Sequence, residues 1–329
     1  MGGDFGPRVT VPASFEYLSE NPRISFTLIG DQAEISSLLP PSSADLADRF
    51  SIVHTSDYIA MNEKPSKALR SKQSSMALAL QAVKAGQADA CVSAGNTGAL
   101  MVLARASLGM HEGIDRPAFI TEIPTEKGGC HVLDLGANVN CEAKHLLQFA
   151  IMGSIISQVV DGKDNPRVGL LNVGQEDMKG NNLVKEAAAL LCERTSLNYI
   201  GFVEGDHIFS DEADVIVCDG FVGNVALKTS EGLAKMINNL LRQTFQQNPY
   251  TKLLGLLMKP FLKKMINQID PKTHNGASLL GLKGIVIKSH GNADAQSFKQ
   301  AINRAVREVE QHVPGLIQKR ISELGDIGS

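Results

Sequence analysis

Aromatic residues are scarce in this 329-residue chain, in which tryptophan is absent and aromatic residues make up 5% of the sequence. Proteins that bind single-stranded nucleic acids stack the bases on aromatic side chains, and proteins that bind duplexes need clustered Lys and Arg. The formal net charge here is −3. We therefore expect no nucleic-acid partner.

Cysteine motifs and long apolar runs are also missing. The cysteines form no C-x-x-C pair and have no histidine at metal-ligand spacing, so we interpret them as reduced, mostly buried thiols and expect no metal and no cofactor. No apolar run approaches the ~20 residues that a bilayer-spanning helix needs, and no signal peptide opens the sequence. These absences predict a cytoplasmic protein. The five cysteines are Cys91, Cys130, Cys141, Cys192 and Cys218.

A dinucleotide site is not indicated either. The sequence has no G-x-G-x-x-G after a predicted strand with an acidic residue about 20 positions further on, and no cluster of Asp on one helix face that would hold a divalent metal. A dehydrogenase is therefore an unlikely interpretation of this chain.

The most informative stretch is residues 213–228, which reads as a strand, a glycine turn and a helix. A helix that opens at the carboxyl end of a strand directs unpaired N–H groups and a positive dipole end at whatever lies above the sheet. Residues 88–98 share its pattern, A-D-x-x-V-x-x-G-x-x-G. Glycine turns recur in every doubly wound sheet, but two copies at one spacing favour a pair of anion-binding turns.

Strands alternate with helices of crossover length along the whole sequence. This alternation predicts one α/β domain over 1–329, with a mainly parallel sheet covered on both faces. In addition to the strand expected within 88–98, strands are expected at 24–29, 51–54, 118–123, 131–134, 167–174, 199–203, 215–218 and 284–288. Helices are expected at 33–39, 76–85, 99–108, 144–160, 183–192, from 224 onward, and at 295–313.

Several motifs together resemble one family, the bacterial phosphate acyltransferases that make acyl phosphate from acyl-[acyl carrier protein] and inorganic phosphate. The resemblance implies a three-layer αβα sandwich like that of phosphotransacetylases and isopropylmalate dehydrogenases, a homodimer, and the first step toward phosphatidic acid in phospholipid synthesis. The motifs span nearly the whole chain, at 1–7, 93–101, 134–138, 171–180, 219–224 and 275–291.

The start of the sequence departs from the family pattern. Members usually place a short strand ending in Asp directly before Met-Gly-Gly-Asp, whereas this sequence begins at that Met. The resemblance therefore predicts a strand upstream of Met1. Adding such a strand is expected to raise the thermal midpoint, because it would pair exposed backbone groups and cover apolar surface.

The reaction that the family implies needs a phosphate dianion held in line with a carbonyl and a stabilised oxyanion. Lys179, a cation in a polar loop, and Asn224, an amide at a helix start, are the predicted catalytic residues, with Asp219 orienting one of them. Alternatively, Lys179 is a surface lysine, Asn224 is an ordinary helix cap, and Asp219 merely ends its strand. His290 could equally be a buried, satisfied histidine. The predicted phosphate- or substrate-binding residues are Gly3, Asp4, Asn96, Thr97, Gly98, Asn138, Gly220, Gly223, Lys228 and His290.

Residues 233–270 interrupt the alternation and predict a helical hairpin. Within it, 250–269 carries apolar residues with lysines as the only charges, and Pro260 is expected to kink or divide the helix. The segment could pack at a dimer interface or lie on an anionic membrane. The apolar product of the resembled family and that family's peripheral membrane association favour reversible membrane binding. A non-catalytic membrane scaffold is the remaining alternative to an enzyme.

Overall fold

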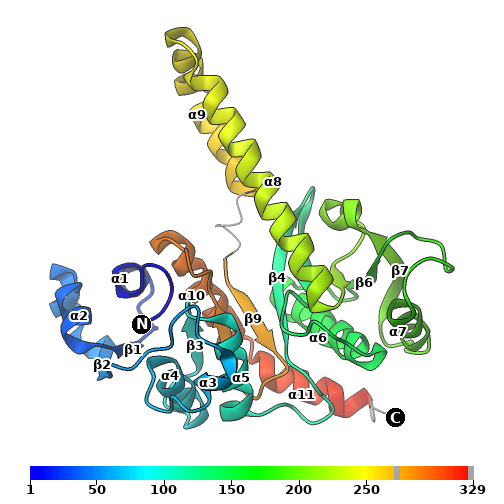
Figure 1. Cartoon of the computed structure of the whole chain (residues 1–329), viewed down its shortest axis with the longest axis horizontal. Helices are drawn as coiled ribbons and strands as arrows, with labels where there is room; N and C mark the ends of the chain where they lie inside the picture. Colours follow the sequence, from blue (N-terminus) through cyan, green and yellow to red (C-terminus); the bar gives the residue numbers. More distant parts are fainter. Residues whose placement is uncertain (270–274, 325–329) are drawn as a thin grey trace.

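The computed structural model describes residues 1–269 and 275–324, with side chains at 1–262 and 275–323. Its centre is an eight-stranded sheet in the order β3-β10-β9-β4-β5-β8-β6-β7 (Figure 1). The strands are β3 (Ala90–Ser93), β4 (Ala118–Thr125), β5 (Gly128–Leu133), β6 (Arg167–Asn172), β7 (Asn198–Glu204), β8 (Val215–Val217), β9 (Ala277–Leu280) and β10 (Ile285–Lys288).

Four of the seven neighbouring pairs in this sheet are parallel, which confirms the α/β class and the mainly parallel sheet. The antiparallel pairs lie together where β10, β9, β4 and β5 adjoin. Thr125 pairs with Gly128 across a connection of only two residues. So short a connection makes a hairpin, because a parallel crossover needs a dozen or more residues.

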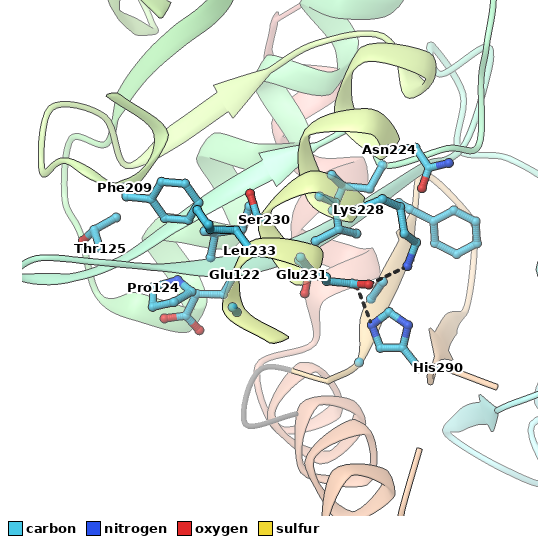
Figure 2. Close-up of a pocket in the computed structure, with 18 of the residues that line it drawn as sticks. Glu122, Pro124, Thr125, Phe209, Asn224, Lys228, Ser230, Glu231, Leu233 and His290 are labelled. Atoms are coloured by element: carbon cyan, nitrogen blue, oxygen red, sulfur yellow. Dashed lines mark hydrogen bonds and ion pairs between the residues drawn. The ribbon is translucent and has the colours of Figure 1, made fainter. Parts of the chain in front are cut away.

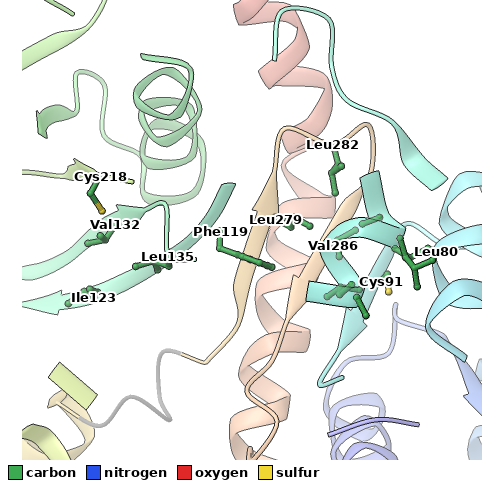
Figure 3. Close-up of a cluster of buried hydrophobic side chains, with 14 of the residues drawn as sticks. Leu80, Cys91, Phe119, Ile123, Val132, Leu135, Cys218, Leu279, Leu282 and Val286 are labelled. Carbon is green, nitrogen blue, oxygen red and sulfur yellow. The ribbon is translucent and has the colours of Figure 1, made fainter. Parts of the chain in front are cut away.

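Helices cover both faces of the sheet. On one face α4, α5 and the start of α8 pack on a core of side chains such as Phe119, Val132 and Val286 (Figure 3). On the other face, α6, α7 and α11 cover a second apolar cluster and α10 covers the side chains of β10. The larger helices are α1 (Pro7–Glu20), α4 (Ser75–Lys84), α5 (Thr97–Leu108), α6 (Ala143–Asp161), α7 (Asn182–Cys192), α8 (Gly220–Gln246), α9 (Pro249–Ile269), α10 (Ala295–Glu310) and α11 (Val313–Leu324).

A small unit at the N-terminal side adjoins this sandwich. Its strands pair in parallel with each other, and α1 packs against α10. The pattern of residues 7–20 did not indicate α1, since Pro12 lies inside it. The unit contains β1 (Phe26–Gly30), β2 (Phe50–His54), α2 (Gln32–Ser37) and the 3-10 helix η1 (Pro41–Arg49). The short α3 (Pro65–Ala68) packs against α5 of the sandwich, and a second 3-10 helix, η2 (Gly205–Phe209), follows β7.

The predicted excursion over 233–270 falls on α8 and α9, which leave the sandwich as a long hairpin (Figure 1). Residue 270 lies outside the described residues. The expectation that Pro260 divides the helix is wrong, because α9 continues through it. Proline removes one backbone donor, and in an exposed helix the carbonyl four residues earlier can face solvent instead.

α6 corrects the expectation that no apolar run approaches the length of a bilayer-spanning helix. By length and composition it is the one helix in the described part of the chain that could cross a membrane, although the sequence indicated no such run. In the fold, 72% of its apolar window is buried. It packs against α7, α11 and β8, so its apolar character is that of a core helix.

Candidate active site

The start of α8 packs tightly on the turn that follows β5. The Asp219 carboxylate accepts hydrogen bonds from the N–H groups of Phe221 and Val222 at 2.9 and 3.0 Å, and Gly220 N–H donates to the Asn138 carbonyl at 2.8 Å. Asp219 therefore caps the helix. The predicted anion cradle at this helix start has its donors already occupied, because Gly223 N–H also donates within the turn, to Asp219.

Gly220 and Gly223 allow the start of α8 to pack closely against the turn after β5. A Cβ on Gly223 would lie 2.0 Å from the Asp134 carbonyl oxygen. Asp134 is fully buried, and burial raises the pKa of its carboxyl although backbone N–H groups of Ala137 and Phe119 donate to it. Asn138 braces the same turn, since its amide donates to Asp134 at 2.9 Å and to the Pro117 carbonyl at 2.7 Å. The predicted binding residue Asn138 thus has its amide committed to the fold.

The second copy of the motif begins α5. Asn96 caps this helix by accepting from Ala99 N–H at 3.0 Å, and its amide donates to the carbonyls of three residues in the preceding loop, Ala60, Met61 and Glu63. A Cβ on Gly98 would meet Pro65 at 2.6 Å. Of the three residues predicted here, Thr97 is the one that lines the cavity described next.

The N-terminal segment joins this region to the turn after β10. Asp4 N–H donates to the Gly291 carbonyl at 2.8 Å. Gly3 has φ +84°, and a Cβ there would lie 3.1 Å from both Gly291 and Ala94. Motifs from the beginning, middle and end of the chain therefore meet at one edge of the site.

A cavity of about 950 Å³ lies between α8 and the sheet (Figure 2). One end carries the apolar side chains of Pro124, Phe209 and Leu233, with Glu122 beside Pro124. We call it the apolar end. Its charged end contains Asn224, Lys228, Glu231, Lys288 and His290. Figure 2 shows Asn224, Lys228 and His290 on the side opposite Pro124 and Phe209.

The charged end is organised around Glu231. Lys228 Nζ lies 2.9 Å from this carboxylate and His290 Nε2 lies 3.5 Å from it. Burial lowers the pKa of His290, Glu231 raises it, and Lys228 lowers it, with a net fall below the ordinary value. The imidazole is thus neutral at pH 7. A second hollow of about 1280 Å³ along α8 and α9 shares Lys228, Glu231 and His290.

Lys179 lies elsewhere, in the loop between β6 and α7. Its ammonium pairs with Glu176 at 2.7 Å, and nearly half of its side chain is exposed. It does not line the cavity with Asn224. Because β6 and β8 are parallel neighbours, the loops that follow them leave the same edge of the sheet. The catalytic assignment of Lys179 stays a prediction.

Sequence reasoning missed Glu231 and Lys288. Glu231 follows Asn224 and Lys228 at helical spacing, so all three lie on one face of α8. Lys288 ends the apolar run of β10, and its charge at that position was the available signal. Within the described residues, no group of three or more His, Cys, Asp or Glu is placed to hold a metal ion.

Known proteins resemble the chain over nearly its full length. A family model described as fatty acid synthesis protein matches residues 1–316. Phosphate acyltransferases of Halorhodospira halophila and Alkalilimnicola ehrlichii are 51% and 52% identical over 325 residues, which cover 98% of this chain and 95% of each relative. A solved phosphotransacetylase from Streptococcus pyogenes shares the fold, with a TM-score of 0.64 at 15% identity over 92% of this chain and 91% of that one. The chain therefore belongs to the phosphate acyltransferase family of fatty acid and phospholipid synthesis.

Proposed function

We propose that this enzyme transfers the acyl group of acyl-[acyl carrier protein] to inorganic phosphate. A phosphate oxygen attacks the thioester carbonyl, the C–S bond of the tetrahedral intermediate breaks, and the carrier thiolate leaves and takes up a proton. The products are acyl phosphate and free carrier protein, and acyl phosphate formation is the first step toward phosphatidic acid. One observation carries the proposal: a single cavity has an apolar end for an acyl chain and a cationic end for an anion.

The residues at the charged end suit this chemistry. Asn224 offers an amide donor for the oxyanion that develops on the carbonyl, and Lys228 offers a positive charge beside it. No covalent enzyme intermediate is required, since phosphate is itself the nucleophile. Lys179 is proposed as the second catalytic cation, in the loop that leaves the same edge of the sheet.

The test is to incubate purified enzyme with acyl-[acyl carrier protein] and phosphate, and to follow acyl phosphate by mass spectrometry. Acyl phosphate and free carrier thiol are expected in equal amounts, with neither formed when phosphate is omitted. Acyl-coenzyme A in place of the carrier thioester tests the donor. If no acyl phosphate forms from the carrier thioester, the proposed donor is wrong, and if no thioester is cleaved at all, a scaffold role becomes the better account.

We further propose that the hairpin serves membrane association and dimerisation. Exposed apolar side chains of α9 could enter the acyl boundary of an anionic bilayer while its lysines contact headgroups. On α8 the exposed Leu233, Met236, Ile237 and Leu240 are proposed to contribute to a two-fold dimer interface. An enzyme placed reversibly at the inner face of the cell membrane would release an apolar product where lipid enzymes act. Among the described side chains of α9, up to residue 262, the exposed apolar ones include Leu253, Leu254, Leu256, Leu257, Met258 and Phe261.

A further inference from the structure

Lys288 is a cation held inside the fold at the wall of the cavity. It is the last residue of β10, and only 8% of its surface is exposed. Along the sheet it pairs with Ser93 of β3 and Ala277 of β9, and its ammonium donates to the Ser289 carbonyl. Lys288 nevertheless lines the cavity that Asn224 and His290 also line.

The charge of Lys288 is not balanced by a neighbouring carboxylate. In the described parts of the chain, no Asp or Glu oxygen lies within salt-bridge distance of its ammonium. Burial lowers the pKa of Lys288 to about 8, Lys228 lowers it as well, and Asp4 opposes the fall. Burying an ammonium without a counter-ion is costly. A bound anion would supply the missing charge.

Glu231 does not fill this role, because its carboxylate pairs with Lys228, with one oxygen 2.9 Å from Lys228 Nζ. The other oxygen lies 3.5 Å from His290 Nε2 and has no hydrogen-bond partner in the described residues. Lys288 is left as the cation at the charged end without a carboxylate partner in the described residues.

The backbone that carries Lys288 is held firmly on both sides. Ser289 N–H donates to the Ser93 carbonyl at 2.9 Å. Asn275, which is buried, donates to the Ser289 hydroxyl at 2.8 Å and accepts from His290 N–H at 3.0 Å. A cation on so fixed a backbone needs little rearrangement when an anion arrives, as in preorganised sites.

We propose that Lys288 is a phosphate-binding residue, whose ammonium pairs with inorganic phosphate at the charged end of the cavity beside Lys228 and His290. The inference rests on the proposed function, since it assigns the site of the nucleophile. Phosphate bound there lies in the same cavity as the apolar end, so one of its oxygens can face the carbonyl of an acyl chain bound along that end.

Calorimetric titration of the full chain with inorganic phosphate, in the absence of any acyl donor, tests the assignment. Lys288→Met removes the charge at similar length and is expected to weaken phosphate binding about tenfold or more. Lys283→Met is the matched control, because Lys283 lies exposed at the opposite end of β10. It should leave the affinity unchanged. Wild-type affinity in Lys288→Met, or an equal loss in both variants, would overturn the assignment.

A second measurement uses the wild-type protein, so its result does not depend on whether a variant folds. Sulfate stays a dianion from pH 7 to 9, and His290 is neutral throughout this range because its pKa is lowered. The other charged groups around this wall are Lys228, Glu231 and Asp4. Loss of the Lys288 proton should weaken sulfate binding about tenfold between pH 7 and 9. A constant affinity would contradict the assignment.

These measurements are separate from the test of the acyl donor. If phosphate binding depends on Lys288 while no acyl phosphate forms from the carrier thioester, the donor is wrong and the phosphate site stands. If acyl phosphate forms at normal KM for phosphate in Lys288→Met, the site is wrong and the proposed reaction stands.

Discussion

The charged end of the cavity depends on a few side chains whose surroundings differ. Asn224 directly follows the first turn of α8, next to the turn of Asp134, and Gly136 lies close enough that a Cβ there would meet its amide group at 3.5 Å. Asp134 and Asn138 are committed to holding this turn. The buried polar groups therefore hold the turn beside the Asn224 amide, which makes no side-chain hydrogen bond within the described part of the chain.

Replacing Asn224 with Ala is expected to reduce turnover about 10²–10³-fold, because a preorganised donor is lost from the site. Steady-state rates of acyl phosphate formation measure the effect. Asn239→Ala, further along the same helix and exposed, should leave the rate near that of the wild type. A normal rate in Asn224→Ala would remove Asn224 from the catalytic machinery.

Lys179→Ala carries the same prediction, a loss of about 10²–10³-fold in turnover with the fold retained. Since Lys179 pairs with Glu176 at an exposed position, a structural role would cost little stability. A large rate loss with an unchanged thermal midpoint would support a catalytic role. Near-normal turnover would leave Lys179 as a surface lysine.

At the scale of elements, α8 connects the site to the hairpin. Its first turn packs on the turn after β5, its next turns carry Asn224, Lys228 and Glu231 into the cavity, and its later turns leave the sandwich with α9 (Figure 1). The half of the hairpin that α8 forms therefore lies on the same helix as the charged end.

Leu254→Glu combined with Leu257→Glu tests the membrane proposal, because two charges on exposed apolar positions of α9 oppose entry into a bilayer. Co-sedimentation with anionic liposomes should be lost, while activity in solution and the proposed dimer, measured by light scattering, should persist. Gln246→Glu with Gln247→Glu adds equal charge at exposed polar positions and controls for repulsion from headgroups. Loss of the dimer instead would make this part of α9 an interface.

At the scale of the whole molecule, the sequence pattern predicts the class and most helices and strands, because apolar periodicity is local. The order of strands is not local. The β4–β5 hairpin and β9 turn the centre of the sheet antiparallel, and no periodicity distinguishes these from parallel strands. Residues 24–54, predicted as ordinary strands of the alternation, instead form a separate pair.

The site shows the same division between local and tertiary information. Turn motifs locate Thr97, Asn224, Lys228 and His290, which do line one cavity. Lys288 could not be assigned to it from the sequence, since a lysine that ends a strand is usually exposed. Only the tertiary packing of β10, which lies between β3 and β9 and packs against α5 and α10, makes it a buried cation.

The repeated A-D-x-x-V motif also contains an aspartate whose role is structural. Asp214 precedes β8 and is 5% exposed. Arg167 donates to it through its backbone N–H at 2.7 Å and its guanidinium at 3.0 Å, and Lys163 also donates to it. Its own carbonyl accepts from His131 N–H at 2.9 Å. One residue thus ties β5 to the beginnings of β6 and β8.

This arrangement predicts how the stability of the whole fold depends on pH. Burial alone would raise the pKa of Asp214, but hydrogen bonds from Arg167 and Lys163 lower it well below its usual range. Because the pKa in the folded state is below the unfolded value of about 3.9, the stabilisation is fully present above pH 4 to 5 and is lost as pH falls further.

Asp214→Asn should therefore lower the free energy of unfolding by about 3 kcal/mol at pH 7, since it breaks a buried ion pair. Urea unfolding of both proteins at a series of pH values should show this difference shrinking below pH 4, whereas exposed Asp206→Asn should match the wild type throughout. A difference that stays the same from pH 7 to pH 3 would mean that packing of the Asp214 side chain, and not its charge, holds these strands together.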